Sequence, residues 1–237
     1  MSYELAVAAH VAVGTVGLLG YWGALAAVKG SPRHRAVGKA FFVTLLLVAL
    51  SVGPVLFLRP GPFDPAYVVQ FTYLSLCLLT VTMIGWTAIR WKHDPERFRG
   101  RAFRILGPVI FVLGLVVLAA GLAGGDPLPA VLSWVGVFFG ATMMRFAWMR
   151  APLHPRWWLN WHLTAVCLLF TAVHGTLLLV VWRWAVDPEA GRPLAAAFQL
   201  LALAIAIGLR LWFGQRRGVP LRFSQPQGGA VRAVVQG

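Results

Sequence analysis

The histidines of this sequence are its residues best suited to chemistry within an apolar environment. His10, His162 and His174 lie inside apolar runs, and His34 lies in a basic segment just before one. A neutral imidazole nitrogen is a good axial ligand for haem iron and a good ligand for copper or zinc. His10 and His174 fall at matched depths below the outer ends of their runs. They are therefore candidates to ligate one haem b, or one transition metal ion, if their helices are neighbours.

Small residues surround the first of these histidines. At about 3.6 residues per turn, His10, Gly14, Gly17 and Tyr21 share one helical stripe. Glycines beside a histidine allow a flat macrocycle to approach, as in bis-histidine membrane cytochromes. Two other interpretations stay open: ordinary packing of small residues between helices, and contact with a quinone or another substrate. His34 and His162 are further candidates for cofactor binding.

Other chemistries lack the residues that they need. All seven Asp and Glu lie outside the apolar runs, and the three lysines, Lys29, Lys39 and Lys92, lie in connections. This pattern disfavours proton-coupled transport and a retinal protein. The sequence has no phosphate-binding loop, HExxH or GxSxG motif. Cys77 and Cys167 have no metal-binding spacing, so packing roles are expected. Whether the chain is an enzyme stays open.

The elements that must position the histidines follow from composition. Hydrophobic residues make up 59% of the 237 residues and charged residues only 12%, about half the share in soluble domains. A membrane-spanning helix needs about 20 apolar residues. The sequence therefore predicts an all-α integral membrane domain over residues 1–213, a bundle of seven transmembrane helices. The expected spans are residues 5–28, 40–58, 66–89, 105–123, 130–149, 159–182 and 194–213.

The charges predict the orientation. Of the 21 Lys and Arg, all but Arg59, Arg183 and Arg192 fall in alternate connections or the C-terminal region. Positively charged connections face the cytoplasm. We therefore expect the N-terminus outside, the C-terminus in the cytoplasm and a multi-pass protein of the bacterial inner membrane. The same rule explains the net charge of +14, so no nucleic-acid partner is expected.

Several basic residues are candidates for contacts with anionic phospholipids. The third connection carries Arg97, Arg99 and Arg101, which we expect to bind lipid headgroups. Arg210 lies near the inner end of the last span and is expected to extend to the interface; contact with a lipid phosphate or a substrate anion is the alternative. Residues 214–237 are expected to form a basic, disordered cytoplasmic tail.

The sequence resembles a large bacterial family of multi-helix membrane proteins of unknown function over residues 5–180. The first hairpin carries the resemblance through His10, Lys29-Gly30 and His34-Arg35-x-x-Gly38. A later part of the pattern is Pro155-Arg156-Trp157-Trp158 followed by Trp161-His162-Leu163. The resemblance implies a membrane protein and adds weight to His10, His34 and His162. It includes no counterpart of His174 and implies no activity.

Two functions follow from these observations. The first is a haem- or metal-binding membrane protein with a redox or cofactor-handling role that depends on its intramembrane histidines. The second is a non-catalytic subunit that interacts with lipids or assembles with another membrane protein in a larger complex. The sequence does not identify a substrate or an oligomeric state.

Reporter fusions test the predicted topology. Fusions after Gly30, Gly100 and Pro155 should report a cytoplasmic location, whereas fusions after Gly61, Gly125 and Gly191 should report a periplasmic one, because the positive connections alternate with poorly charged ones. Paired phosphatase and fluorescent-protein fusions at each site provide the measurement. A site with the opposite location would contradict the seven-helix topology.

Overall fold

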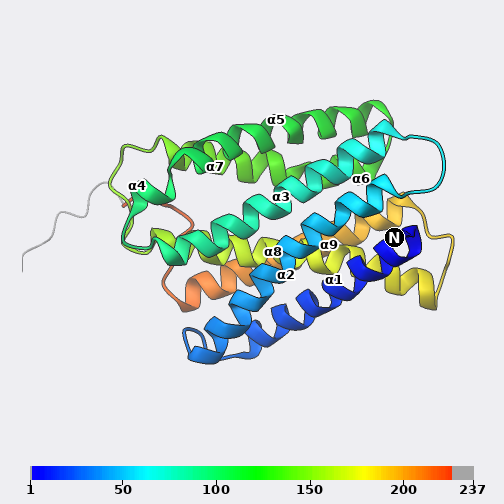
Figure 1. Cartoon of the computed structure of the whole chain (residues 1–237). Coiled ribbons are helices and arrows are strands. Elements are labelled where there is room, and N and C mark those ends of the chain that lie inside the picture. Colours follow the sequence, from blue (N-terminus) through cyan, green and yellow to red (C-terminus); the bar gives the residue numbers. More distant parts are fainter. Residues whose placement is uncertain (1, 226–237) are drawn as a thin grey trace, which may run out of the picture.

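Seven long apolar segments dominate the structure, a computed structural model that describes residues 2–225. Each is helical and is long and apolar enough to cross a membrane, which supports a multi-pass membrane protein. A four-residue helix, α4, lies between the third and fourth segments (Figure 1). The helices are α1 (Tyr3–Ala26), α2 (Pro32–Phe57), α3 (Pro65–Arg90), α4 (Pro95–Phe98), α5 (Arg101–Ala123), α6 (Pro127–Leu132), η1 (Val135–Phe139), α7 (Gly140–Ala147), α8 (Trp157–Ala185) and α9 (Arg192–Arg216).

Three of the long segments begin with the same local signal, a capping side chain followed by proline. Ser31, Asp64 and Asp126 each accept a hydrogen bond from a backbone N–H in the first turn of the helix that follows. Proline at the first helical position removes no helical hydrogen bond, because a backbone N–H at that position has no partner within the helix. Helix α2 consequently starts well before its apolar run, and His34 lies on its first turn rather than in a loop.

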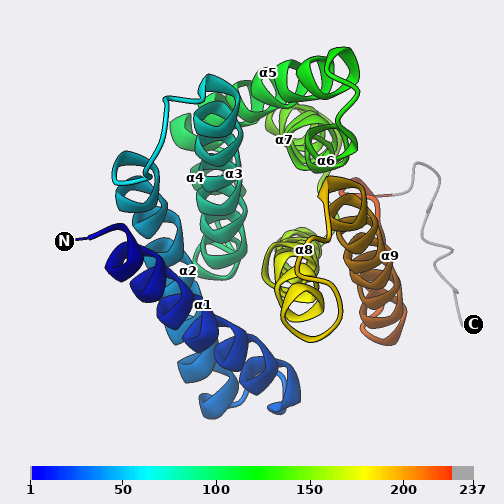
Figure 2. The ribbon, with the colours of Figure 1, turned by 90° about the vertical axis from the view of Figure 1, so that its right-hand side faces the viewer.

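The helices form adjacent antiparallel pairs. Helix α1 packs mainly on α2, and α8 on α9, while α3 lies between α2 and α8. Helix α5 packs along the segment α6–η1–α7, and α6 reaches α9 (Figure 2). The contact between α1 and α8 is small. The expectation that the first and sixth spans are neighbours is therefore met over only a short length.

A glycine seam brings α5 and the segment α6–η1–α7 into backbone contact. Gly107, Gly114 and Gly121 recur every seventh residue on α5. A Cβ atom at Gly114 would lie 2.8 Å from the backbone nitrogen of Val137, and one at Gly140 would lie 2.8 Å from the carbonyl oxygen of Gly107. Small residues allow apolar helices to approach this closely.

Tyr73 of α3 accounts for the break in the fifth span, where η1 is a π-helix. Its hydroxyl accepts a hydrogen bond from the backbone N–H of Gly136 at 2.9 Å and donates to the carbonyl of Ser133 at 3.0 Å. A π-helix disturbs the regular hydrogen-bond ladder, so backbone groups need other partners. The buried tyrosine provides them and joins α3 to the glycine seam.

An aromatic cluster joins several segments at one end of the bundle. Trp161 of α8 is fully buried and is surrounded by rings from α4, α5, η1, α7 and the C-terminal segment. We name this set the Trp161 cluster, and it consists of Phe98, Phe103, Phe139, Phe146, Trp157, Trp161 and Phe223.

The expectation of disorder after residue 213 is wrong for residues 214–225. Helix α9 continues to Arg216, and the Phe223 ring stacks on Trp161 with centroids 4.7 Å apart. An isolated antiparallel bridge joins Leu153 to Ser224. Burial of one aromatic side chain and these backbone hydrogen bonds order a segment that is polar in sequence. The rest of the expected tail, residues 226–237, lies outside the described residues.

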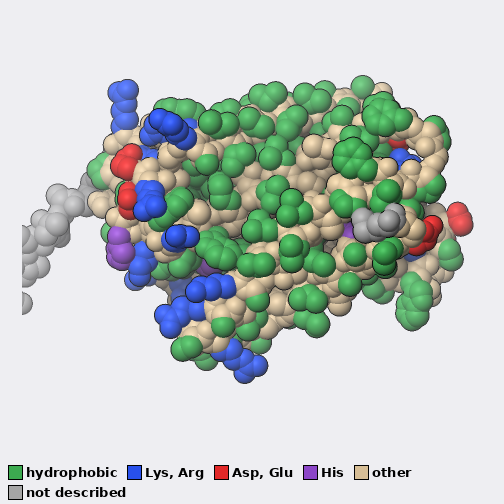
Figure 3. Space-filling model, in the orientation of Figure 1, with side chains coloured by type: hydrophobic (Ala, Val, Ile, Leu, Met, Phe, Trp, Pro, Cys, Tyr) green, Lys and Arg blue, Asp and Glu red, His purple; other side chains and the backbone are tan. Residues whose placement is uncertain are grey.

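Basic side chains gather at the same end of the bundle, which we call the basic end (Figure 3). At the other end, Arg192 forms an ion pair with Asp126 and Arg59 lies 3.9 Å from Asp64. The separation of charges seen in the sequence is therefore also a separation in space.

The glycine seam generates a stability prediction. A Cβ atom at Gly136 would collide with the carbonyl oxygen of Ile110 and approach Gly114 and the Tyr73 hydroxyl at 2.9 Å. Gly136→Ala should therefore lower the free energy of unfolding by about 1–3 kcal/mol, the usual cost of overpacking. Thermal unfolding in detergent measures the change. The matched control is Gly53→Ala, because no heavy atom lies within 4 Å of that Cβ position. Equal stability of the two variants would contradict backbone contact at the seam.

Candidate functional site

His10 lies at the interface between α1 and α2. Its Nδ1 is 2.8 Å from the hydroxyl of Ser51, and that hydroxyl donates its hydrogen to the carbonyl of Val48. The imidazole Nδ1 must therefore be the donor to Ser51, which leaves Nε2 unprotonated in the neutral ring. The stripe beside it faces α2, where a Cβ atom at Gly17 would touch Thr44 at 3.4 Å, while Gly14 has no heavy atom within 4 Å of its Cβ position. Gly17 is therefore a packing residue between α1 and α2, and Gly14 is not.

His174 of α8 has partners for both ring nitrogens. Its Nδ1 donates to the carbonyl of Phe170 at 3.0 Å, and its Nε2 accepts a hydrogen bond from the indole nitrogen of Trp22 at 3.0 Å. Its ring stacks on Phe170 and meets Tyr21 edge-on. The ring is buried and neutral in this arrangement, and it has no lone pair left for a metal.

The structure does not bring His10 and His174 together as a ligand pair. His174 meets Trp22, which lies twelve residues beyond His10 on α1, or about 18 Å along the helix axis. The two rings are held in different interfaces, one by Ser51 and the other by Trp22. The matched depths of His10 and His174 in their apolar runs did not predict this separation. Depth specifies neither the tilt of a helix nor which of its faces meets another helix.

His34 and His162 share a different arrangement. The Nδ1 of His34 is 2.9 Å from the carbonyl of Ala24, and the Nδ1 of His162 is 2.9 Å from the carbonyl of Gly85. A carbonyl only accepts, so each Nδ1 is protonated, and in the neutral ring each Nε2 carries a lone pair. Among the described residues neither Nε2 has a hydrogen-bond partner. Histidines that bind metals commonly donate their other N–H to a backbone carbonyl in this way.

Both rings lie near the basic end. His34, on the first turn of α2, contacts the end of α1, and His162, on α8, contacts α2 and α3. The Phe42 ring of α2 meets His162 edge-on, with centroids 6.3 Å apart, and also contacts Trp86. The sequence treated His34 and His162 as separate candidates. The structure connects them through α2, which carries His34 and contacts His162 through Phe42.

Lys29, which the sequence placed in a basic connection and in the family-like pattern of the first hairpin, lies close to His34, since both contact the carbonyl of Ala24. Its ammonium group donates to the carbonyls of Ala24 and Leu25 at the end of α1 and lies 5.7 Å from the ring centre of Phe213. Burial, followed by the charge of Arg217, lowers the pKa of Lys29. The signal in the sequence was its position five residues before His34.

The three arginines proposed to bind lipid have different surroundings. Arg99 is half-buried, pairs with Glu96 and donates to the carbonyl of Met149 at 3.0 Å. Arg97 and Arg101 are exposed, and the Arg97 guanidinium lies over the Trp91 ring. Arg99 therefore has a structural role in holding α4, whereas the other two remain available to headgroups.

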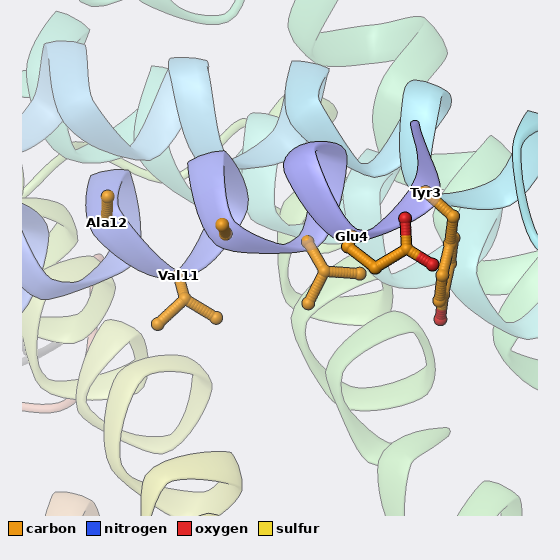
Figure 4. Close-up of a pocket in the computed structure, with 6 residues that line it drawn as sticks. Tyr3, Glu4, Val11 and Ala12 are labelled. Carbon is orange, nitrogen blue, oxygen red and sulfur yellow. The ribbon is translucent and has the colours of Figure 1, made fainter. Parts of the chain in front are cut away.

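Two surface hollows lie away from the histidine pair. The first, of about 580 Å³, is formed by six residues of α1 alone and includes Tyr3 and Val11 (Figure 4). Because one helix forms it and most of its wall is apolar, it is part of the helix surface rather than an enclosed site. The second, of about 540 Å³, lies between the end of α2 and the start of α3 and contains Arg59 and Asp64. Neither hollow is lined by histidine.

Among the described residues, no group of three or more His, Cys, Asp or Glu side chains is placed to hold a metal ion. Comparisons with protein-family models, curated proteins and solved structures found no match.

The contact of His174 with Trp22 can be tested by a double-mutant cycle. Trp22→Phe should lower the free energy of unfolding by about 1 kcal/mol, because it leaves the His174 Nε2 without a donor. Thermal unfolding of Trp22→Phe, His174→Phe and the double variant measures the coupling. Trp184→Phe is the control, since its side chain is 87% exposed. Fully additive losses would show that the two side chains do not interact.

Proposed function

We propose that this protein binds haem b, or a transition metal ion, through the Nε2 atoms of His34 and His162 and has a redox or cofactor-handling role in a membrane. The observation that carries the proposal is the pair of Nδ1–carbonyl hydrogen bonds at 2.9 Å. These bonds select the tautomer and hold the ring, which are the two things that a ligand histidine needs from its surroundings.

The number of available ligands favours haem. A structural zinc site normally needs four protein ligands and a catalytic one three, whereas a six-coordinate haem needs only two axial residues from the protein. His34 and His162 satisfy that requirement without a third side chain. Their rings lie on different long segments, α2 and α8. Two ligands on separate helices are the usual arrangement for a cofactor inside a bundle.

The basic side chains near the two histidines also favour haem. Lys29 binds the same carbonyl, that of Ala24, as His34, and Arg33 and Arg35 flank His34 on the first turn of α2. Basic side chains at this position would neutralise the propionates of a haem at the membrane interface. When bound, haem would supply one-electron chemistry. The protein would supply ligands, a low dielectric and counter-charges.

The orientation follows from the distribution of charge. We propose that the basic end faces the cytoplasm of a bacterial cell, that the N-terminus is outside, and that the protein lies in the inner membrane. The support is the gathering of Lys and Arg at one end of the helices (Figure 3). Arg97 and Arg101 would then contact anionic phospholipids of the inner leaflet. That contact alone would also suit the second candidate, a lipid-interacting subunit.

Absorption spectroscopy tests the haem proposal. The wild-type protein, expressed with haem supplied and purified in a mild detergent, should show a Soret band. His34→Ala and His162→Ala should each lose the band or shift it, because each removes one of the two axial ligands. His10→Ala and His174→Ala are the matched controls and should retain it.

Metal analysis of the same preparations separates the metal-ion form of the proposal from the haem form. A copper content that is lost in the same two variants, without a Soret band, would support a metal ion in place of haem. Circular dichroism shows whether each variant is folded. A folded wild-type preparation that contains neither haem nor metal would refute the proposal, as would equal Soret bands in all four variants.

A further inference from the structure

Arg210 is a buried cation for which the described residues provide no carboxylate partner. It lies on α9 with 7% of its surface exposed. Its Nε donates to the hydroxyl of Thr164 at 3.0 Å, and one terminal nitrogen donates to the side-chain oxygen of Asn160 at 2.6 Å. Both acceptors are neutral and lie on α8. The other terminal nitrogen is buried without a hydrogen-bond partner. The expectation that this arginine extends to the interface is not met.

This arrangement is costly for a simple structural clamp. Removing a guanidinium from water costs several kcal/mol unless an opposite charge and a full set of acceptors compensate. The ion pairs found among the described residues are Arg59–Asp64, Arg99–Glu96 and Arg192–Asp126. Arg210 therefore keeps an uncompensated charge and an unused donor. An anion with two or more oxygens would satisfy both.

The C-terminal segment covers this cation from the basic end. The carbonyl of Pro220 accepts a hydrogen bond from the side-chain nitrogen of Asn160 at 2.8 Å and lies 3.5 Å from Arg210. Gly218, whose φ is +57°, reverses the chain just before it. The Pro220 oxygen faces Nη2, the nitrogen that also donates to Asn160, and not the unpartnered Nη1. It thus stands where one oxygen of an anion could lie between Arg210 and Asn160, and it carries only a partial charge.

The covering segment, residues 217–225, belongs to no helix and is held by side-chain contacts and a few backbone hydrogen bonds. The Phe223 ring stacks on Trp161, the Phe223 carbonyl accepts from the N–H of His154 at 2.7 Å, and the N–H of Gln225 donates to Pro152 at 2.9 Å. Arg156 donates to the carbonyls of Arg217 and Gly218, and Val219 is buried. Opening of the segment would break these contacts but would leave the hydrogen bonds within the helices intact.

The covering segment is strongly positive. Arg217 and Arg222 belong to it, Arg216 directly precedes it and lies 4.3 Å from the ring centre of Trp212, and Arg156 donates to its backbone. Positive charge around an opening raises the local concentration of anions. The planar guanidinium suits phosphate, which it can bind through two parallel hydrogen bonds.

We propose that Arg210 and Asn160 form a binding site for a phosphate group and that residues 217–225 form its cover, with the Pro220 carbonyl in the place of a phosphate oxygen. The phosphate enters from the basic end and displaces this carbonyl. The group belongs either to a free phosphate-bearing solute or to a phospholipid headgroup, since both present the same oxygens. The site is separate from the histidine pair.

Binding of inorganic phosphate to the full-length protein in a neutral detergent tests the free-solute source. Isothermal titration at constant ionic strength, with chloride as the reference salt, should detect binding to the wild type. Nanodiscs of phosphatidylglycerol and of phosphatidylcholine test the headgroup source. In both cases trypsin should cut faster after Arg217 and Arg222 when the site is occupied, because the cover is then displaced.

Two variants and a control connect the binding to Arg210. Arg210→Gln removes the cation. Gly214→Ala places a Cβ atom against the Arg210 guanidinium and should displace it. Each should weaken binding by at least tenfold. Gly208→Ala lies on the same helix, has no heavy atom within 4 Å of its Cβ position, and should bind like the wild type.

The outcomes distinguish a free phosphate-bearing solute from a phospholipid headgroup. Binding of phosphate in detergent, lost in the folded Gly214→Ala variant, supports the site with a free solute as its ligand. Faster cleavage only in phosphatidylglycerol nanodiscs, lost in the same variant, supports the site with a headgroup as its ligand. Binding that is equal in Arg210→Gln and the wild type overturns the proposal, as does the absence of both binding and faster cleavage in the wild type.

Discussion

A polar group inside this bundle must find its partner within the chain, and most of the architecture depends on that constraint. The seven long segments are apolar, and a lipid environment offers no hydrogen bonds to a buried imidazole, hydroxyl or guanidinium. His10 meets Ser51, His174 meets Trp22, and Tyr73 meets the backbone of η1. Each of these contacts joins two different helices. The polar residues thus determine which helix faces meet, although apolar residues make up most of the surface.

The same constraint explains the difference between the two proposed sites. At His34 and His162 one ring nitrogen has a protein partner and the other has a lone pair, so the unsatisfied atom is an acceptor that suits a metal. At Arg210 the unsatisfied atom is a donor on a cation, so it suits an anion. Each site is incomplete in a chemically specific way. The described residues complete neither of them, whereas His174 is complete and is therefore best explained as a structural residue.

Two parts of the bundle are packed by different kinds of residue. Helices α5 and α6–η1–α7 approach through glycines, so their backbones touch and leave no room for a ligand. Around Trp161, large rings fill the space and join α4, α8 and the C-terminal segment. Helix α1 contacts mainly α2 and has only a small contact with α8.

The sequence by itself determined where the long helices lie, because the signals for a helix are local. Apolar length predicted all seven segments, and Ser31-Pro32, Asp64-Pro65 and Asp126-Pro127 mark three of their starts. The tertiary structure alone decided the partners of the polar residues. The contact of His174 joins residues 152 positions apart, and that of His162 joins residues 77 positions apart. Such pairs depend on helix tilt and on which faces meet, and neither can be read from hydropathy. For the same reason the sequence paired His10 with His174, placed Arg210 at the interface and treated residues 214–225 as disordered. In the structure His10 meets Ser51 of α2, whereas Arg210 and the segment 214–225 pack against α8.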